Sequence, residues 1–164
     1  MLRSKIYKAI RDHSKSMLPY LQACDLQKGQ FINPKKNYPL PLPAMLVEFQ
    51  GFRFTNLLGH KQKGDGTISI YLYLDLVTDS LDGAEQENET IELLDYMDRV
   101  YQAFEGFGIE GMTPLNRINE VKPQYGERFI MFRVDFTTTV DDEKIHDNIT
   151  ALRPEPNISL KYKF

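Results

Sequence analysis

The sequence predicts an α+β fold: an antiparallel β-sheet that carries one main helix and an N-terminal amphipathic helix. Apolar residues recur at every second position over residues 67–78 and again over residues 128–140, as in strands with one buried face. Between residues 93 and 107 the apolar steps are instead 4, 3, 4 and 3, which places those side chains on one face of a helix. Residues 44–56 are expected to pair with residues 67–78 as a long hairpin.

The composition is typical of a globular protein with one core. The chain has 164 residues, of which 41% are hydrophobic and 26% charged, so one domain is the default. We expect that domain over residues 1–141 and an extended tail over residues 142–164. No apolar run approaches the roughly 20 residues that span a bilayer, and the first residues lack the features of a secretory signal. A single cysteine fits a reducing, cytosolic compartment.

The first part of the chain is predicted to be a basic amphipathic helix followed by a proline-rich connector. Residues 2–17 separate apolar from basic side chains at helical spacing, which favours packing on the chain's own sheet. A membrane surface or nucleic acid is the alternative partner for such a helix. The prolines of residues 28–43 favour a stiff lead-in to a strand, with a proline-rich recognition ligand as the alternative.

Residues 56–66 are expected to form a loop that contacts a partner. The preceding strand, residues 44–56, contains Gly51 as an expected β-bulge. Two glycines of the loop match the first half of a phosphate-binding spacing, but neither the lysine nor the helix that should follow is present. The contact candidates in this loop are Leu58, His60, Lys61 and Lys63.

The second faces of the two long strands are expected to form an outer surface that is wet or bound to a partner. On residues 67–78 that face carries Ser69, Tyr71, Tyr73 and Asp75. The strand at residues 128–140 adds Arg133 and Asp135 on its own second face. Because these faces are polar or amphipathic, they do not resemble a sealed core face. Tyr71 and Tyr73 are therefore candidates for an interface.

Charge is distributed unevenly along the chain. Residues 1–36 hold eight Lys or Arg against two Asp, whereas residues 75–110 hold eleven Asp or Glu against Arg99 alone. Such opposite charges favour attraction within one molecule or between copies, and two ordinary solvated faces are the alternative. The candidate mates are Lys8, Arg11 and Lys15 on the first helix and Glu92, Asp95 and Asp98 on the main helix.

The last third of the chain is expected to contain a weak strand, a long strand and a tail. Residues 112–123 predict the weak strand, limited by Pro114 and Pro123. The acidic run at residues 141–143 is expected to end the pairing of the long strand. After two prolines, the alternating residues 158–164 predict a strand that pairs with a neighbouring copy or partner, with a disordered tail as the alternative. Its interface candidates are Ile158, Leu160 and Tyr162.

No catalytic, cofactor or metal motif stands out in the sequence. The three histidines are far apart, and with only Cys24 as a thiol a structural zinc site is not expected. Cys24 with a distant histidine is a conceivable nucleophile pair, but a small buried hydrophobe is the ordinary role. Basic residues do not interleave with aromatic ones, which argues against sequence-specific nucleic-acid binding. We therefore expect neither enzymatic activity nor a cofactor.

Three segments carry a resemblance to a known family. They are PLPLPAMLVEF leading into the sheet, LLDYMDRVYQAFEGF as the helix and FIMFRVDFTTTV as the last core strand. With them, residues 40–140 resemble the tail-terminator and tail-completion proteins of long-tailed bacteriophages.

This resemblance implies a non-enzymatic α+β subunit that assembles as a ring, usually a hexamer, where the tail tube meets the head connector. The implied partners are other copies of the chain, tail-tube proteins and head-connector proteins. The implied location is the bacterial cytoplasm during assembly and then the tail or neck of the virion. A small ferredoxin-like binding or regulatory module is the alternative, and a hydrolytic enzyme using scattered carboxylates is the third choice.

Overall fold

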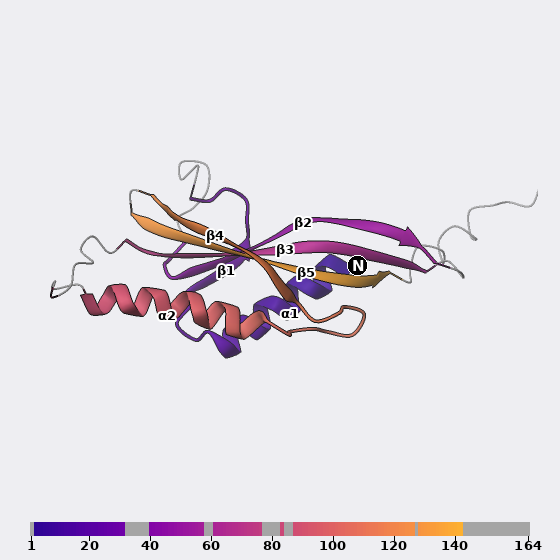
Figure 1. The fold of residues 1–164 in the computed structure, drawn as a ribbon, viewed down its shortest axis with the longest axis horizontal. Coiled ribbons are helices and arrows are strands. Elements are labelled where there is room, and N and C mark those ends of the chain that lie inside the picture. Colours follow the sequence, from indigo (N-terminus) through magenta and orange to yellow (C-terminus); the bar gives the residue numbers. More distant parts are fainter. Residues whose placement is uncertain are drawn as a thin grey trace, which may run out of the picture.

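The computed structural model describes residues 2–31, 40–57, 61–76, 83, 87–126 and 128–142. These residues form two helices and a five-stranded sheet (Figure 1). The elements are α1 (Leu2–Met17), β1 (Ala23–Leu26), β2 (Ala44–Asn56), β3 (Gln62–Asp75), α2 (Glu87–Phe104), β4 (Asn116–Tyr125) and β5 (Phe129–Asp142). The strand order is β1-β2-β3-β5-β4, and every neighbouring pair is antiparallel except β1 with β2. A mostly antiparallel sheet with helices confirms the predicted α+β class.

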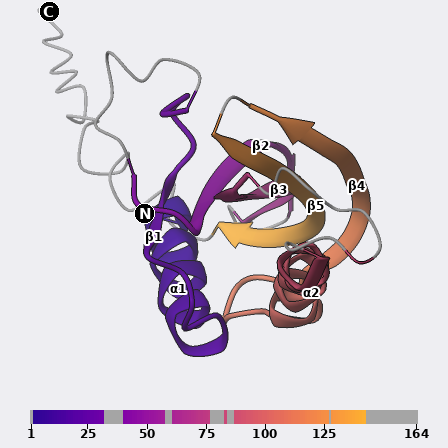
Figure 2. The same ribbon diagram turned by 90° about the vertical axis from the view of Figure 1, so that its left-hand side faces the viewer.

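Both helices cover the same face of the sheet, and the main core lies between them and the strands (Figure 2). The predicted apolar faces of the two long strands are buried in this core: Ile68, Ile70, Leu72 and Leu74 from β3, and Ile130, Phe132, Val134 and Phe136 from β5. Ile6 and Ile10 of α1 are 0% exposed in the same cluster. The first helix therefore packs on the chain's own sheet, as its pattern favoured.

Helix α2 supplies the predicted core stripe but ends earlier than the pattern suggests. Leu93, Val100 and Phe104 are buried, at about 1.5–3 kcal/mol for each side chain of this size. Gly106 then adopts a φ of 77°, a left-handed conformation that commonly ends helices. Phe107 consequently lies beyond the helix, where its ring stacks on His13 with the centroids 4.2 Å apart.

Strand β3 begins five positions before its expected start, so most of the predicted loop is strand. Residues 62–66 pair with both β2 and β5. Gly64 and Gly66 lie in the range expected to be a loop. Each lies beneath an aromatic ring of β2, and a Cβ atom there would approach Phe54 or Phe52 within 2.6 or 2.4 Å. The glycines therefore make room for the rings. The expected bulge is present, as a register shift between Phe49 and Gly51.

The ends of β4 and β5 also differ from the prediction. Pro123 does not end the weak strand but lies inside β4, at a register irregularity between Val121 and Gln124. Because β4 is the outermost strand, the missing N–H of a proline is tolerated there. The first two residues of the acidic run do not end β5 but continue its pairing: Asp141 pairs with Lys63 and Asp142 with Gln62.

Strand β1 was not expected, because its four residues carry no clear period. It pairs in parallel with the start of β2, from Ala23 opposite Ala44 to Leu26 opposite Val47. This pairing directs the following residues over the second face of the sheet, the one opposite the helices. There Phe31, Leu40 and Leu42 pack against a small second cluster of Ala44, Leu46, Tyr71, Tyr73 and Met131. Part of the proline-rich connector, residues 32–39, lies outside the described residues.

Candidate functional site

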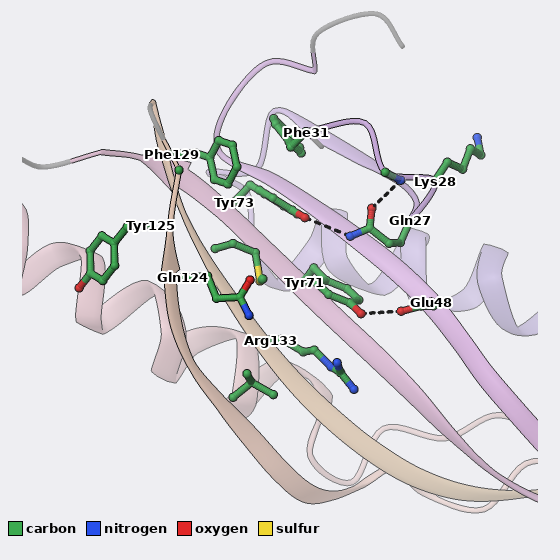
Figure 3. Close-up of a pocket in the computed structure, with 14 residues that line it drawn as sticks. Gln27, Lys28, Phe31, Glu48, Tyr71, Tyr73, Gln124, Tyr125, Phe129 and Arg133 are labelled. Atoms are coloured by element: carbon green, nitrogen blue, oxygen red, sulfur yellow. Dashed lines mark hydrogen bonds between the residues drawn. The ribbon is translucent and has the colours of Figure 1, made fainter. Parts of the chain in front are cut away.

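A cleft of about 580 Å³ lies on the second face of the sheet (Figure 3). One wall comes from the segment that follows β1, and the other comes from the ends of β4 and β5. The residues that matter below are Gln27, Phe31, Glu48, Tyr71, Tyr73 and Arg133. The cleft combines aromatic rings with both signs of charge.

The floor of the cleft is formed by the tyrosines that the sequence placed on an open surface. Tyr73 is 3% exposed and Tyr71 is 8% exposed, so neither ring presents a free face to solvent. Phe31 stacks on Tyr73 with the ring centroids 4.1 Å apart, and Gln27 Nε2 donates a hydrogen bond to the Tyr73 hydroxyl at 3.0 Å. The expected open tyrosine surface is therefore largely covered by the chain itself.

Tyr71 is held between a carboxylate and a guanidinium. Its hydroxyl donates a hydrogen bond to Glu48 Oε2, and Arg133 lies 5.6 Å from the centre of its ring. Burial, followed by the hydrogen bond to Glu48, raises the pKa of Tyr71 to about 12. The phenol is therefore protonated at neutral pH and donates its hydrogen bond to Glu48.

Beside the cleft, Asp135 is the centre of a hydrogen-bond network that joins three strands. It is 5% exposed and accepts hydrogen bonds from Ser69 Oγ, from Asn119 Nδ2 at 3.0 Å and from Arg133 Nε at 2.8 Å. Burial alone raises the pKa of Asp135, but the hydrogen bonds and the positive charge of Arg133 outweigh burial and lower it below the ordinary value. The ionised carboxylate thus stabilises the folded sheet.

Asp135→Asn is expected to destabilise the protein at neutral pH by about 1.5–3 kcal/mol, the range for hydrogen bonds to charged groups. Because the folded-state pKa is lowered, the contribution is complete above the unfolded-state pKa of about 3.9 and is lost as pH falls through the folded value. Urea unfolding of parent and variant should therefore converge in acid. The exposed Asp75→Asn is the control, and a loss that is the same at every pH would contradict the assignment.

At the other end of the sheet, β2, β3 and β5 extend beyond both helices (Figure 1). We call residues 48–57, 61–68 and 137–142 the arm; at its base, Ile68 and Val140 still belong to the main core, and Phe49 and Phe52 pack against it. Phe49, Phe52 and Phe54 follow one another along its helix-side face, with successive ring centroids 6.4 and 6.3 Å apart. Phe54 is 41% exposed and Leu57 44% exposed. The end of the arm, at Phe54 and Leu57, therefore presents apolar surface away from the core.

The two edges of the arm differ. On the β5 side, residues 111–113 cover the edge: Thr113 N donates to Thr139 O and Asp141 N donates to Gly111 O, both at 2.8 Å. On the β2 side, β1 reaches only as far as Val47, whose carbonyl accepts from Gln27 N. In the part of the chain that the structure describes, no strand pairs with the outer edge of residues 48–56. One edge is closed and the other is open.

The charged candidates lie on the outer surfaces of the two helices. Lys8, Lys15, Glu92, Asp95 and Asp98 are exposed, and Arg11 is partly buried. Arg11 pairs with its neighbour Asp12 at 3.0 Å, and Glu92 accepts a hydrogen bond from Tyr96. Within the described ranges, no ion pair joins α1 to α2. The two sets of charge are therefore not neutralised by each other inside one subunit.

The structure does not bring the remaining candidates to one place. Lys63 lies in β3 near the end of the arm, opposite Thr55 and Asp141, and Lys61 is exposed just before that strand. The remaining interface candidates, from the predicted loop and from the tail, are outside the described residues: Leu58, His60, Ile158, Leu160 and Tyr162. Sequence reasoning missed Gln27, Phe31 and Glu48, because only the fold carries them to the tyrosines.

The described residues show few features of catalytic or metal chemistry. Burial raises the pKa of the Cys24 thiol above its ordinary value, although hydrogen bonding to Ser14 and the charge of Arg11 oppose this effect. Nowhere in the described ranges do three His, Cys, Asp or Glu side chains gather as they do around a metal ion. Neither described helix combines the length and the apolar character needed to cross a membrane.

Comparison with models of known protein families gives no match, and no curated protein sequence is significantly similar to this chain. The functional argument therefore depends on the surfaces described above.

Proposed function

We propose that this chain is a non-enzymatic structural subunit that forms a ring at the tail end or head-tail junction of a long-tailed bacteriophage or prophage. The observation that carries the proposal is the arm, in which three strands with one open edge and an aromatic face extend beyond the helices. In this proposal β2 and β3 form the long hairpin of the family that the sequence resembles. The partners are further copies of the chain, in a hexamer, together with tail-tube and head-connector proteins.

The distribution of surfaces supports head-to-tail association. The arm, the acidic face of α2 and the basic face of α1 are three different surfaces on one subunit. When two different surfaces of identical copies meet, the contact is heterologous, and it closes into a ring if its rotation allows. We propose that the basic face of one subunit meets the acidic face of the next.

Charge reversal tests this contact. Lys8→Glu with Lys15→Glu should shift the protein towards monomer, because the reversed charges repel the acidic face of the next copy. Lys8 and Lys15 are exposed, as are Asp95 and Asp98 on α2, so charge reversal at these positions should leave the fold of the monomer unaffected. Adding Asp95→Lys with Asp98→Lys to the same chain should restore assembly, since the two faces then carry charges of opposite sign again. Sedimentation velocity at low and high salt measures the outcome.

The pair of charge reversals on α1 and the pair on α2 serve as controls for each other. The α2 pair alone should also weaken assembly, and the parent assembly should weaken as salt rises, since the screening length is about 8 Å at physiological strength. Failure of the four-fold variant to recover, with both pairs folded, would contradict the charge contact.

A small binding module is the second candidate function, and the cleft on the second face is the observation that favours it. Its lining rings Phe31 and Phe129, together with Glu48 and Arg133, are suited to a small polar ligand or a peptide side chain. The two functions differ in native mass. A binding module is expected to be a monomer whose melting temperature rises with its ligand, whereas the ring subunit assembles without one.

A further inference from the structure

Two strand edges have no strand partner among the described residues: the outer edge of residues 48–56 in β2 and that of β4, which Pro123 and two register shifts interrupt. A strand edge presents unpaired N–H and C=O groups that favour pairing with another strand. Val47 shows the direction of these groups, since its carbonyl points to the outer side and accepts from Gln27 N. Beyond Val47 the same edge continues to Asn56 without a strand partner in the described residues. An added strand there would extend the sheet by one.

The two faces of this edge have different chemistry. Phe49, Phe52 and Phe54 lie on the helix-side face, whereas Gln50, Arg53 and Thr55 are polar. A strand that pairs here therefore has to be amphipathic, with its apolar residues continuing the aromatic face. In the same chain, residues 158–164 alternate in this way: Ile158, Leu160, Tyr162 and Phe164 are separated by Ser159, Lys161 and Lys163.

The described chain ends close to the open edge of β2. Asp142 is the last described residue, and it pairs with Gln62, which in turn pairs with Asn56 at the end of the open edge. The tail therefore starts two strand spacings, about 10 Å, from its own β2 edge. Residues 143–157 precede the alternating segment and reach roughly 50 Å when extended. Two prolines, Pro154 and Pro156, favour an extended approach.

We propose that residues 158–164 of one copy pair with the outer edge of residues 48–56 in the next copy. When extended, residues 143–157 span far more than the roughly 10 Å to the β2 edge of the same subunit. Pairing with the next subunit makes use of the reach of residues 143–157. This inference rests on the proposed ring and names one contact within it: each subunit donates its tail and accepts one in turn, a head-to-tail arrangement.

Disulfide trapping between two different chains tests the exchange. One full-length chain carries Arg53→Cys on the polar side of the edge, and a second, distinguishable by an affinity tag, carries Lys161→Cys on the polar side of the tail. Both carry Cys24→Ala to remove the native thiol. Arg53 is exposed, so its replacement should leave the fold intact. Mixing and mild oxidation should give a disulfide between the two chains, because side chains directly opposite on paired strands lie about 5 Å apart.

The matched control pairs the same tail cysteine with Glu120→Cys. Glu120 is exposed on β4, at the far side of the sheet from β2, and it should give at least tenfold less product. A third chain that carries both Arg53→Cys and Lys161→Cys is oxidised at the concentration at which the parent protein assembles. A disulfide within that single chain, in place of one between chains, would show that the tail folds back on its own subunit and would overturn the proposal.

The failure of this inference can be distinguished from the failure of the ring. Rings that form without a disulfide between Arg53→Cys and Lys161→Cys would eliminate the tail exchange and leave the proposed function standing. A trapped pair in a protein that never exceeds a dimer would retain the strand contact and contradict the ring. Equal trapping at Arg53→Cys and Glu120→Cys would show unspecific contact and would also eliminate the exchange.

Discussion

Phe104→Asp is expected to give insoluble or unfolded protein. Phe104 is 0% exposed and lies at the centre of the main core, with its ring edge-on to Phe107 and Phe136 at centroid distances of 6.1 and 6.4 Å. Removing a buried phenylalanine alone costs about 3–5 kcal/mol. The introduced carboxylate adds the cost of an unpaired buried charge. Since domains are stable by only about 5–15 kcal/mol, the sum approaches the whole stability of the fold.

The measurement is the yield of soluble protein followed by thermal unfolding of whatever is recovered. Val100→Asp should behave in the same way, because Val100 is 1% exposed in the same core. Asp98→Ala is the control on the same helix: its side chain is exposed, so its melting temperature should equal that of the parent. A Phe104→Asp protein that melts with the parent would show that the helix does not carry the core.

Gly66→Ala is expected to disrupt the arm far more than Gly64→Ala. A Cβ at Gly66 would lie 2.4 Å from the backbone oxygen of Gly51 as well as 2.4 Å from the ring of Phe52. At Gly64 the clash, at 2.6 Å, involves only the ring of Phe54, which is 41% exposed and can rotate away. Overpacking typically costs about 1–3 kcal/mol, and the backbone contact places Gly66 at the upper end.

Urea unfolding compares the two variants directly, and sedimentation reports whether each still assembles. Gly66→Ala should lose both stability and assembly, because β2 has to move away from β3 within the open edge, at Phe52. Gly64→Ala should retain most of both. A Gly66→Ala variant that loses as little as Gly64→Ala would mean that the bulge at Gly51 adapts easily and that the arm is not rigid.

The faces of the long elements could be predicted from the sequence because each has a strong period. The alternation around Ile70 and Val134 and the helical stripe through Val100 all correspond to buried faces. Local signals failed where tertiary contacts override them. Gly64 suggested a loop but accommodates a ring, and Pro123 suggested a strand end but lies in an outermost strand.

The cleft could be predicted only in part. Tyr71 and Tyr73 were correctly placed on one face of their strand, but the side chains that cover them come from other segments. Gln27 is 46 positions from Tyr73 in the sequence, and Glu48 is 23 positions from Tyr71. The link is the parallel pairing of β1, whose four residues are too short to show a period. The second face is therefore covered because of the β1–β2 pairing, which the sequence pattern does not predict.

Native mass spectrometry of the full-length protein, from dilute to concentrated solution, tests the central claim most directly. The proposed ring predicts one closed oligomer of more than two copies, with a sixfold mass in the hexamer case, that dissociates as salt is raised before transfer. A head-to-tail contact that did not close would instead give a ladder of sizes. A monomer at every concentration and salt tested would contradict the account.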